Sequence, residues 1–127
     1  MEEKREYKRY RCNVEINFKF YEGNPDEMDV ETSTPLKGKG FMLDIGRGGA
    51  FIVSNSRVSV KMPVKLNFKV KKTKYSIYGF VSRTGFIKNN PDEIVRRYKA
   101  YEGKADIYIG IKFDTLISED IVMGINS

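Results

Sequence analysis

The amino-acid sequence predicts an all-β fold, a six-stranded antiparallel Greek-key-like β-barrel with a short C-terminal helix. Two observations lead to this prediction. Several segments alternate apolar and polar residues with a period of two, which is typical of strands with one buried and one exposed face. Six such segments follow one another at short spacing in 127 residues, without a repeated strand–helix alternation. Closing them into a barrel removes exposed strand edges.

Three of the predicted strands show a regular alternation. They are 13–20, 64–70 and 107–113, and their apolar positions hold mainly Val, Ile, Leu and Phe. The three strands with a less regular pattern are 40–44, 50–54 and 75–83. Glycines at 46, 48 and 49 indicate a tight turn between 40–44 and 50–54, because glycine adopts the backbone angles that sharp turns require.

Two segments outside the strands carry helix-start signals. Asn90 can cap a helix and Pro91 suits its first position, so we expect an extra short helix near 90–101. Ser118 can cap a C-terminal helix that continues through Ile125. Residues 21–35 are acidic, contain Pro25 and Pro35, and are predicted to form a long loop.

The chain length indicates one domain with a single core. We divide it into a flexible arm that bears arginines, the barrel and the C-terminal helix. These parts are residues 1–12, 13–116 and 117–127.

The chain has no histidine and a single cysteine, Cys12. This composition excludes zinc sites of the usual His/Cys kind, an intrachain disulfide and histidine-based acid–base catalysis. We therefore expect a protein that is not an enzyme and that needs no metal or cofactor. Cys12 follows Arg11, and basic neighbours can activate a thiol, but we expect it to be a buried structural residue. No apolar run has the length of a membrane span and no signal peptide is evident, so we expect a cytoplasmic protein.

The formal net charge of +6 suggests an anionic partner. Its distribution is uneven. Residues 4–11 and 57–74 are basic, whereas 22–31 holds five acidic residues and no basic one. This pattern indicates local surfaces with separate roles.

Two features of the chain could hold an anion. Arg5 and Arg9 lie four residues apart just before the first predicted strand, and a guanidinium donates paired hydrogen bonds to phosphate or a purine edge and stacks on π systems. Asp44 ends a predicted strand just before the glycine turn, where its carboxylate could accept hydrogen bonds from the N1–H and amine of a guanine. Taken alone, the arginines fit a solvated terminus and Asp44 a turn cap.

Together, the two features resemble the paired signature of the PilZ domain. That family carries RxxxR and then [D/N]xSxxG, and this chain has Arg5-x-x-x-Arg9 and Asp44-x-Gly46-x-x-Gly49. The resemblance continues through GGAFIVS at 48–54 and MPVKLNFKV at 62–70. It then covers GFVSR at 79–83 and IGIKFDTLISED at 109–120.

The resemblance implies a receptor for the bacterial second messenger cyclic di-GMP. It implies that Arg5 and Arg9 clamp phosphates and contact guanine, that Asp44 reads a guanine edge, and that Gly49 permits the turn beneath the ligand. Gly46 replaces the family serine, which removes a hydroxyl; the Gly46 N–H is expected to remain a donor, and Gly46→Ser to tighten binding. One or two nucleotides could bind. Binding is expected to order residues 4–12 and recruit a partner protein from motility, exopolysaccharide or adhesion machinery.

Two other functions remain open. The missing serine also fits a PilZ-like protein-interaction module that no longer binds nucleotide. A β-barrel that binds RNA or single-stranded DNA is the third hypothesis, because Lys65, Lys69 and Lys71 share a strand face beside Tyr75 and Tyr78. Alternate lysines on an outer sheet face commonly serve only solubility, and under the preferred function we expect no DNA partner.

Overall fold

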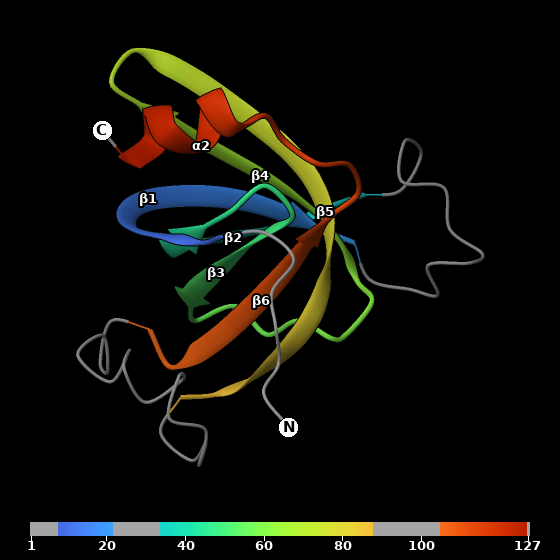
Figure 1. Ribbon diagram of the computed structural model, residues 1–127. Helices are drawn as coiled ribbons and strands as arrows, with labels where there is room; N and C mark the ends of the chain where they lie inside the picture. The colour runs from blue at the N-terminus through green and yellow to red at the C-terminus, as the bar shows by residue number, and fades with distance from the viewer. Residues whose placement is uncertain (1–7, 22–33, 88–104, 127) are drawn as a thin grey trace, which may run out of the picture.

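The computed structural model describes residues 8–21, 34–87 and 105–126. These residues form six strands and one helix (Figure 1). The elements are β1 (Tyr10–Phe20), β2 (Leu36–Ile45), β3 (Gly49–Ser54), β4 (Pro63–Val70), β5 (Thr73–Phe86), β6 (Ile107–Phe113) and α2 (Glu119–Asn126). The predicted all-β class and the C-terminal helix are confirmed.

The strands close into a barrel in the order β1-β2-β3-β6-β5-β4, and every neighbouring pair is antiparallel. Two three-stranded units, β1–β3 and β4–β6, are joined by the connection 55–62, so β3 and β4 are consecutive in sequence but not neighbours in the sheet. Closure depends on β1 and β4, which pair from Ile16 opposite Phe68 to Phe20 opposite Val64. β1 residues before Ile16 have no pairing with β4.

The barrel interior is filled by the apolar positions of the alternating segments. Ile16, Leu66 and Ile109 are among its fully buried side chains. β3 is buried along its whole length, because Ala50 and Ile52 face the interior while its other face belongs to a second apolar cluster outside the barrel. This outer cluster contains Leu43, Phe51, Val53, Ile87, Ala105 and Tyr108.

The C-terminal helix α2 begins as predicted. The Ile121 N–H donates to the Ser118 side-chain oxygen at 3.2 Å, so Ser118 caps the helix. Val122 and Ile125 are buried in the barrel core, and α2 lies against the β1, β4 and β5 side of the barrel (Figure 1). No helix among the described residues is long and apolar enough to cross a membrane.

Several boundaries differ from the predicted ones. Tyr10–Cys12 belong to β1 rather than to a flexible arm, because Tyr10 pairs with Ile45 and Arg11 with Asp44. β2 begins at Leu36, four residues before the predicted start at position 40. Its additional residues pair with the end of β1, where Leu36 lies opposite Phe20. The expected helix near 90–101 and residues 22–33 of the acidic loop lie outside the described residues.

Candidate ligand-binding site

The glycine turn between β2 and β3 is tight, as predicted. The Gly46 N–H donates to the Gly49 carbonyl at 2.9 Å, and the Phe113 N–H donates to the Gly48 carbonyl at 2.9 Å. A Cβ at Gly49 would overlap the Ile111 carbonyl oxygen, so β6 approaches this turn more closely than any other residue type allows. The Gly46 N–H, which is expected from the sequence to be a donor to the ligand, donates within the turn in this structure.

Arg9 lies directly over this turn and is held by Asp44. An Arg9 guanidinium nitrogen, Nη1, lies 3.1 Å from Oδ1 of Asp44, with side-chain exposures of 23% and 9%. Asp44 faces outward because the β2–β3 register shifts between Met42 and Asp44 and then pairs Asp44 with Phe51. The buried carboxylate thus fixes the position of the partly exposed guanidinium.

Both glycines of the motif accommodate the segment that carries Arg9. A Cβ at Gly46 would lie 2.8 Å from the Lys8 carbonyl oxygen and 3.1 Å from Arg9 Cγ. A Cβ at Gly49 would lie 2.9 Å from the other guanidinium nitrogen, Nη2. The structure therefore brings together Arg9, Asp44, Gly46 and Gly49, whereas Arg5 lies outside the described residues.

A cationic and aromatic cluster that the sequence did not reveal lies on the outer face of the barrel, formed by Phe51 of β3, Arg83 of β5 and Tyr108 of β6. The Arg83 guanidinium lies 5.8 Å from the Phe51 ring centre and 5.6 Å from that of Tyr108. The two rings are parallel within 2° and 5.8 Å apart. A Cβ at Gly110 would lie 2.9 Å from Arg83 Cγ, so this glycine allows Arg83 to lie across β6. Phe51 is two positions from Gly49, roughly 7 Å along the strand, which places the cluster beside Arg9.

Cys12 on β1 is half-buried, and its thiol is not activated. Burial, and then the charge of Asp44, raise the pKa of its thiol from 9.0 to about 12. The thiol donates to the Met42 carbonyl at 3.4 Å. Its structural role, predicted from the sequence, fits this environment, and no group of His, Cys, Asp and Glu among the described residues could hold a metal ion.

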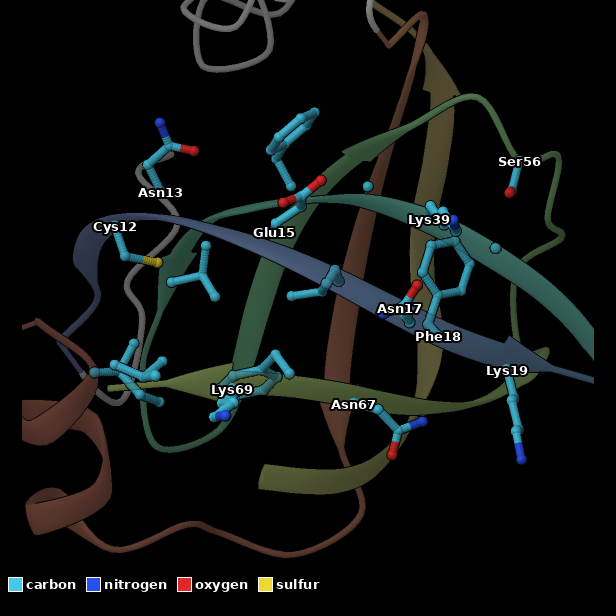
Figure 2. Close-up of a pocket in the computed structure, with 18 of the residues that line it drawn as sticks. Cys12, Asn13, Glu15, Asn17, Phe18, Lys19, Lys39, Ser56, Asn67 and Lys69 are labelled. Atoms are coloured by element: carbon cyan, nitrogen blue, oxygen red, sulfur yellow. The ribbon is translucent and has the colours of Figure 1, made fainter. Parts of the chain in front are cut away.

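A large hollow lies elsewhere, along β1 (Figure 2). It has a volume of about 1560 Å³ and opens where β1 diverges from β4. Its lining combines outward polar residues, such as Asn17 and Asn67, with core residues such as Phe18. Asp44, Gly46 and Gly49 do not line it. Size alone favours this hollow as a binding site. Its lining, however, mixes outward polar residues with core residues, as in a gap between strands. We therefore place the candidate site at Arg9 and Asp44.

Comparison with known proteins supports the fold. No family model and no curated protein sequence matches the chain. Among solved structures, the PilZ domain with c-di-GMP of YcgR from Escherichia coli matches with a TM-score of 0.55 at 10% identity, over 98% of this chain and 87% of that one. The chain has a PilZ-like fold. The inhibitor of motility MotI/DgrA of Bacillus subtilis also matches, with a TM-score of 0.58 at 12% identity. The match covers 98% of this PilZ-like chain and 49% of MotI/DgrA, so the chain spans about half the length of that protein.

Proposed function

We propose that this protein is a cyclic di-GMP receptor domain that acts without catalysis in the bacterial cytoplasm. One observation carries the proposal. In a PilZ-like barrel, Arg9 and Asp44 are paired at 3.1 Å over the glycine turn, so a phosphate-binding cation and a guanine-reading carboxylate share one surface. The solved YcgR domain of the same fold was determined with c-di-GMP.

Each residue of the proposed site has a distinct task. The Arg9 guanidinium binds a ligand phosphate with paired hydrogen bonds and, with Arg5, stacks on guanine. The Asp44 carboxylate accepts hydrogen bonds from a guanine edge, which only purines with two adjacent donors satisfy. Arg83 adds positive charge next to this surface, where Phe51 and Tyr108 hold its guanidinium.

Signalling in this proposal is a change in conformation. A nucleotide that binds both Arg9 and Asp44 competes with their ion pair. The segment before β1 then has two arrangements, with and without this ion pair, and the nucleotide shifts the equilibrium between them only as far as its affinities for the two differ. The rearranged segment then forms part of a surface for a partner protein. Motility machinery is one such partner class, since MotI/DgrA is an inhibitor of motility; exopolysaccharide and adhesion machinery are others.

Isothermal titration of the purified chain with cyclic di-GMP tests the proposal. We expect measurable binding, at least tenfold weaker affinity for Arg9→Ala, and a smaller loss for Arg83→Ala. Arg57→Ala is the matched control, because Arg57 contacts Phe86 and not the turn. An absence of heat at high micromolar protein, or equal affinities for Arg9→Ala and the control, contradicts the proposal.

A second function is favoured by the turn itself. The Gly46 N–H is bonded to the Gly49 carbonyl and the serine hydroxyl of the family motif is absent, so this position offers the ligand no donor. A PilZ-like module that binds a protein without nucleotide is consistent with this geometry. A partner captured equally well with and without cyclic di-GMP, and equally by wild type and Arg9→Ala, supports this second function over the first.

A further inference from the structure

Outward lysines gather on the outside of four neighbouring strands, away from Arg9 and Asp44, with one exposed acidic residue, Glu15 on β1, beside them. In these strands, residues that point into the barrel alternate with residues that point outward, and several of the outward residues are lysines. We call the surface formed by these lysines the lysine face. It consists of Lys19 on β1, Lys37 and Lys39 on β2, Lys65 and Lys69 on β4, and Lys74 on β5. Figure 2 shows part of it, with Asn17 and Lys19 on β1 and Asn67 and Lys69 on β4.

The pairing register places these lysines opposite one another. Lys19 is directly opposite Lys37 on one side and Lys65 on the other, and Lys69 is directly opposite Lys74. Like charges in directly opposite positions destabilise a sheet. Within residues 8–21, 34–87 and 105–126, none of these lysines forms an ion pair with a carboxylate. A bound anionic partner would relieve this repulsion between the lysines.

The centre of the lysine face is polar rather than apolar. Asn17 is directly opposite Asn67, and the Ser76 hydroxyl donates to the Asn67 side-chain oxygen at 2.8 Å. Stable protein–protein interfaces have an apolar core from which lysine is depleted. A folded acidic protein is therefore a poor fit to this surface.

The face also lacks the stacking platform of a single-stranded nucleic-acid site. The sequence hypothesis placed Tyr75 beside the lysines, but the Tyr75 ring packs against the core, stacked on Phe68 at 5.2 Å between ring centres. Tyr78 is exposed, and its ring is contacted by the Lys65 ammonium at 5.3 Å. One such ring does not provide successive bases with aromatic partners, and the face contains no arginine for bidentate contacts.

We propose that the lysine face binds the surface of a membrane that contains anionic lipids. Lysine ammoniums on flexible stems are point charges, and they suit an array of mobile headgroup phosphates that imposes no fixed geometry. Clusters of four to eight basic residues on one surface, about the number here, bind anionic leaflets, each lysine contributing roughly fivefold to the partition coefficient. Leu36, 42% exposed beside Lys37, adds an apolar contact at the edge. The proposal does not rest on nucleotide binding.

Vesicle cosedimentation tests this proposal. Vesicles of phosphatidylcholine with about 30% phosphatidylglycerol are compared with pure phosphatidylcholine in about 50 mM salt, where exposed charges are weakly screened. The test variant is Lys37→Gln/Lys39→Gln/Lys69→Gln. The control, Lys8→Gln/Arg57→Gln/Lys112→Gln, loses the same charge from equally exposed positions elsewhere. Circular dichroism establishes that both are folded.

We expect binding only to the anionic vesicles, about a hundredfold weaker partitioning for the test variant, and retained partitioning for the control and for Arg9→Ala. Soluble glycerol 3-phosphate at the same phosphate concentration and ionic strength should not compete. No binding to anionic vesicles, or an equal loss in both triple variants, overturns the proposal. A single-stranded RNA that binds through the same lysines while vesicles do not also overturns it, in favour of a nucleic-acid face.

Discussion

Arg9 and Asp44, which are 35 positions apart in the sequence, form an ion pair in which the guanidinium lies 3.1 Å from the carboxylate. Both are residues that the motif assigns to ligand contact. The pair positions the guanidinium over the glycine turn. Under the proposed function, a nucleotide would have to replace this contact, and its net affinity would be the difference between the new contacts and the broken pair.

Substitution of Asp44 should separate its structural role from its role in recognition. Asp44→Ala leaves the Arg9 guanidinium without this acceptor, and we expect a loss of about 1–3 kcal/mol in the free energy of unfolding. Asp44→Asn keeps a side-chain oxygen and should lose less. Urea denaturation measures both, and titration with cyclic di-GMP should find binding in the Asn variant and not in the Ala variant. Equal stability of all three proteins would show that the ion pair contributes nothing to folding.

Gly46→Ser introduces two opposite effects. Its Cβ would lie 2.8 Å from the Lys8 carbonyl oxygen, so the segment before β1 must shift, at a cost of about 1–3 kcal/mol in stability. Its hydroxyl restores a donor at the turn. Gly46→Ala is the matched control, because it has the Cβ without the hydroxyl. We expect both variants to be similarly destabilised in thermal denaturation, and Ser to bind cyclic di-GMP roughly ten- to a hundredfold more tightly than Ala. Equal affinities would exclude a role for the hydroxyl.

Replacement of glycine by alanine should lower the free energy of unfolding at one position of this chain and raise it at another. Gly49→Ala forces a Cβ into the Ile111 carbonyl of β6, and since backbone cannot rotate away we expect a loss of about 2–3 kcal/mol or failure to fold. Gly124 lies in α2, where the nearest atom to a Cβ is the Tyr75 hydroxyl at 3.8 Å. Gly124→Ala should therefore raise the free energy of unfolding by about 0.5–1 kcal/mol. Chemical denaturation of the two variants measures the contrast, and a destabilised Gly124→Ala would contradict it.

Strand positions were predictable from the sequence because burial of one face imposes a period of two. The alternation around Ile16 and Leu66 assigned the right residues to the interior, and Ser118 identified the start of α2. Strand ends were less predictable. Leu36–Lys39 joins β2 because it pairs with β1, and such pairing depends on residues distant in sequence.

The candidate site was predictable only as far as local motifs describe it. The motif residues Arg9, Asp44 and Gly49 meet in space. Arg83 was not predicted, because its position depends on the missing side chain of Gly110 on the neighbouring strand. The full lysine face was likewise hidden, since Lys19 and Lys65 become neighbours only through the register that closes the barrel.

The Cys12 thiol should remain protonated at pH values well above those at which a free thiol ionises. Burial, followed by the Asp44 charge, raises its pKa from 9.0 to about 12. Since the folded-state pKa is the higher one, this group's contribution to stability is fully present below pH 9 and is lost as pH rises toward 12. We expect slow modification by a thiol reagent at pH 8, an increase in rate only toward pH 12, and faster reaction in Asp44→Asn. The urea-unfolded chain is the control. A native rate equal to that control at pH 8 would contradict the raised pKa.

Lys19 should weaken the fold through its two lysine neighbours. Because Lys37 and Lys65 lie directly opposite it, Lys19→Glu converts two repulsive cross-strand pairs into attractive ones. We expect the free energy of unfolding to rise by about 0.5–1 kcal/mol at low ionic strength, and the gain to shrink in 1 M salt, where the Debye length falls to about 3 Å. Lys112→Glu on β6 is the control for the change in net charge. Urea denaturation at both salt concentrations measures the effect, and an equal gain in the control would attribute it to net charge rather than to the register of the lysine face.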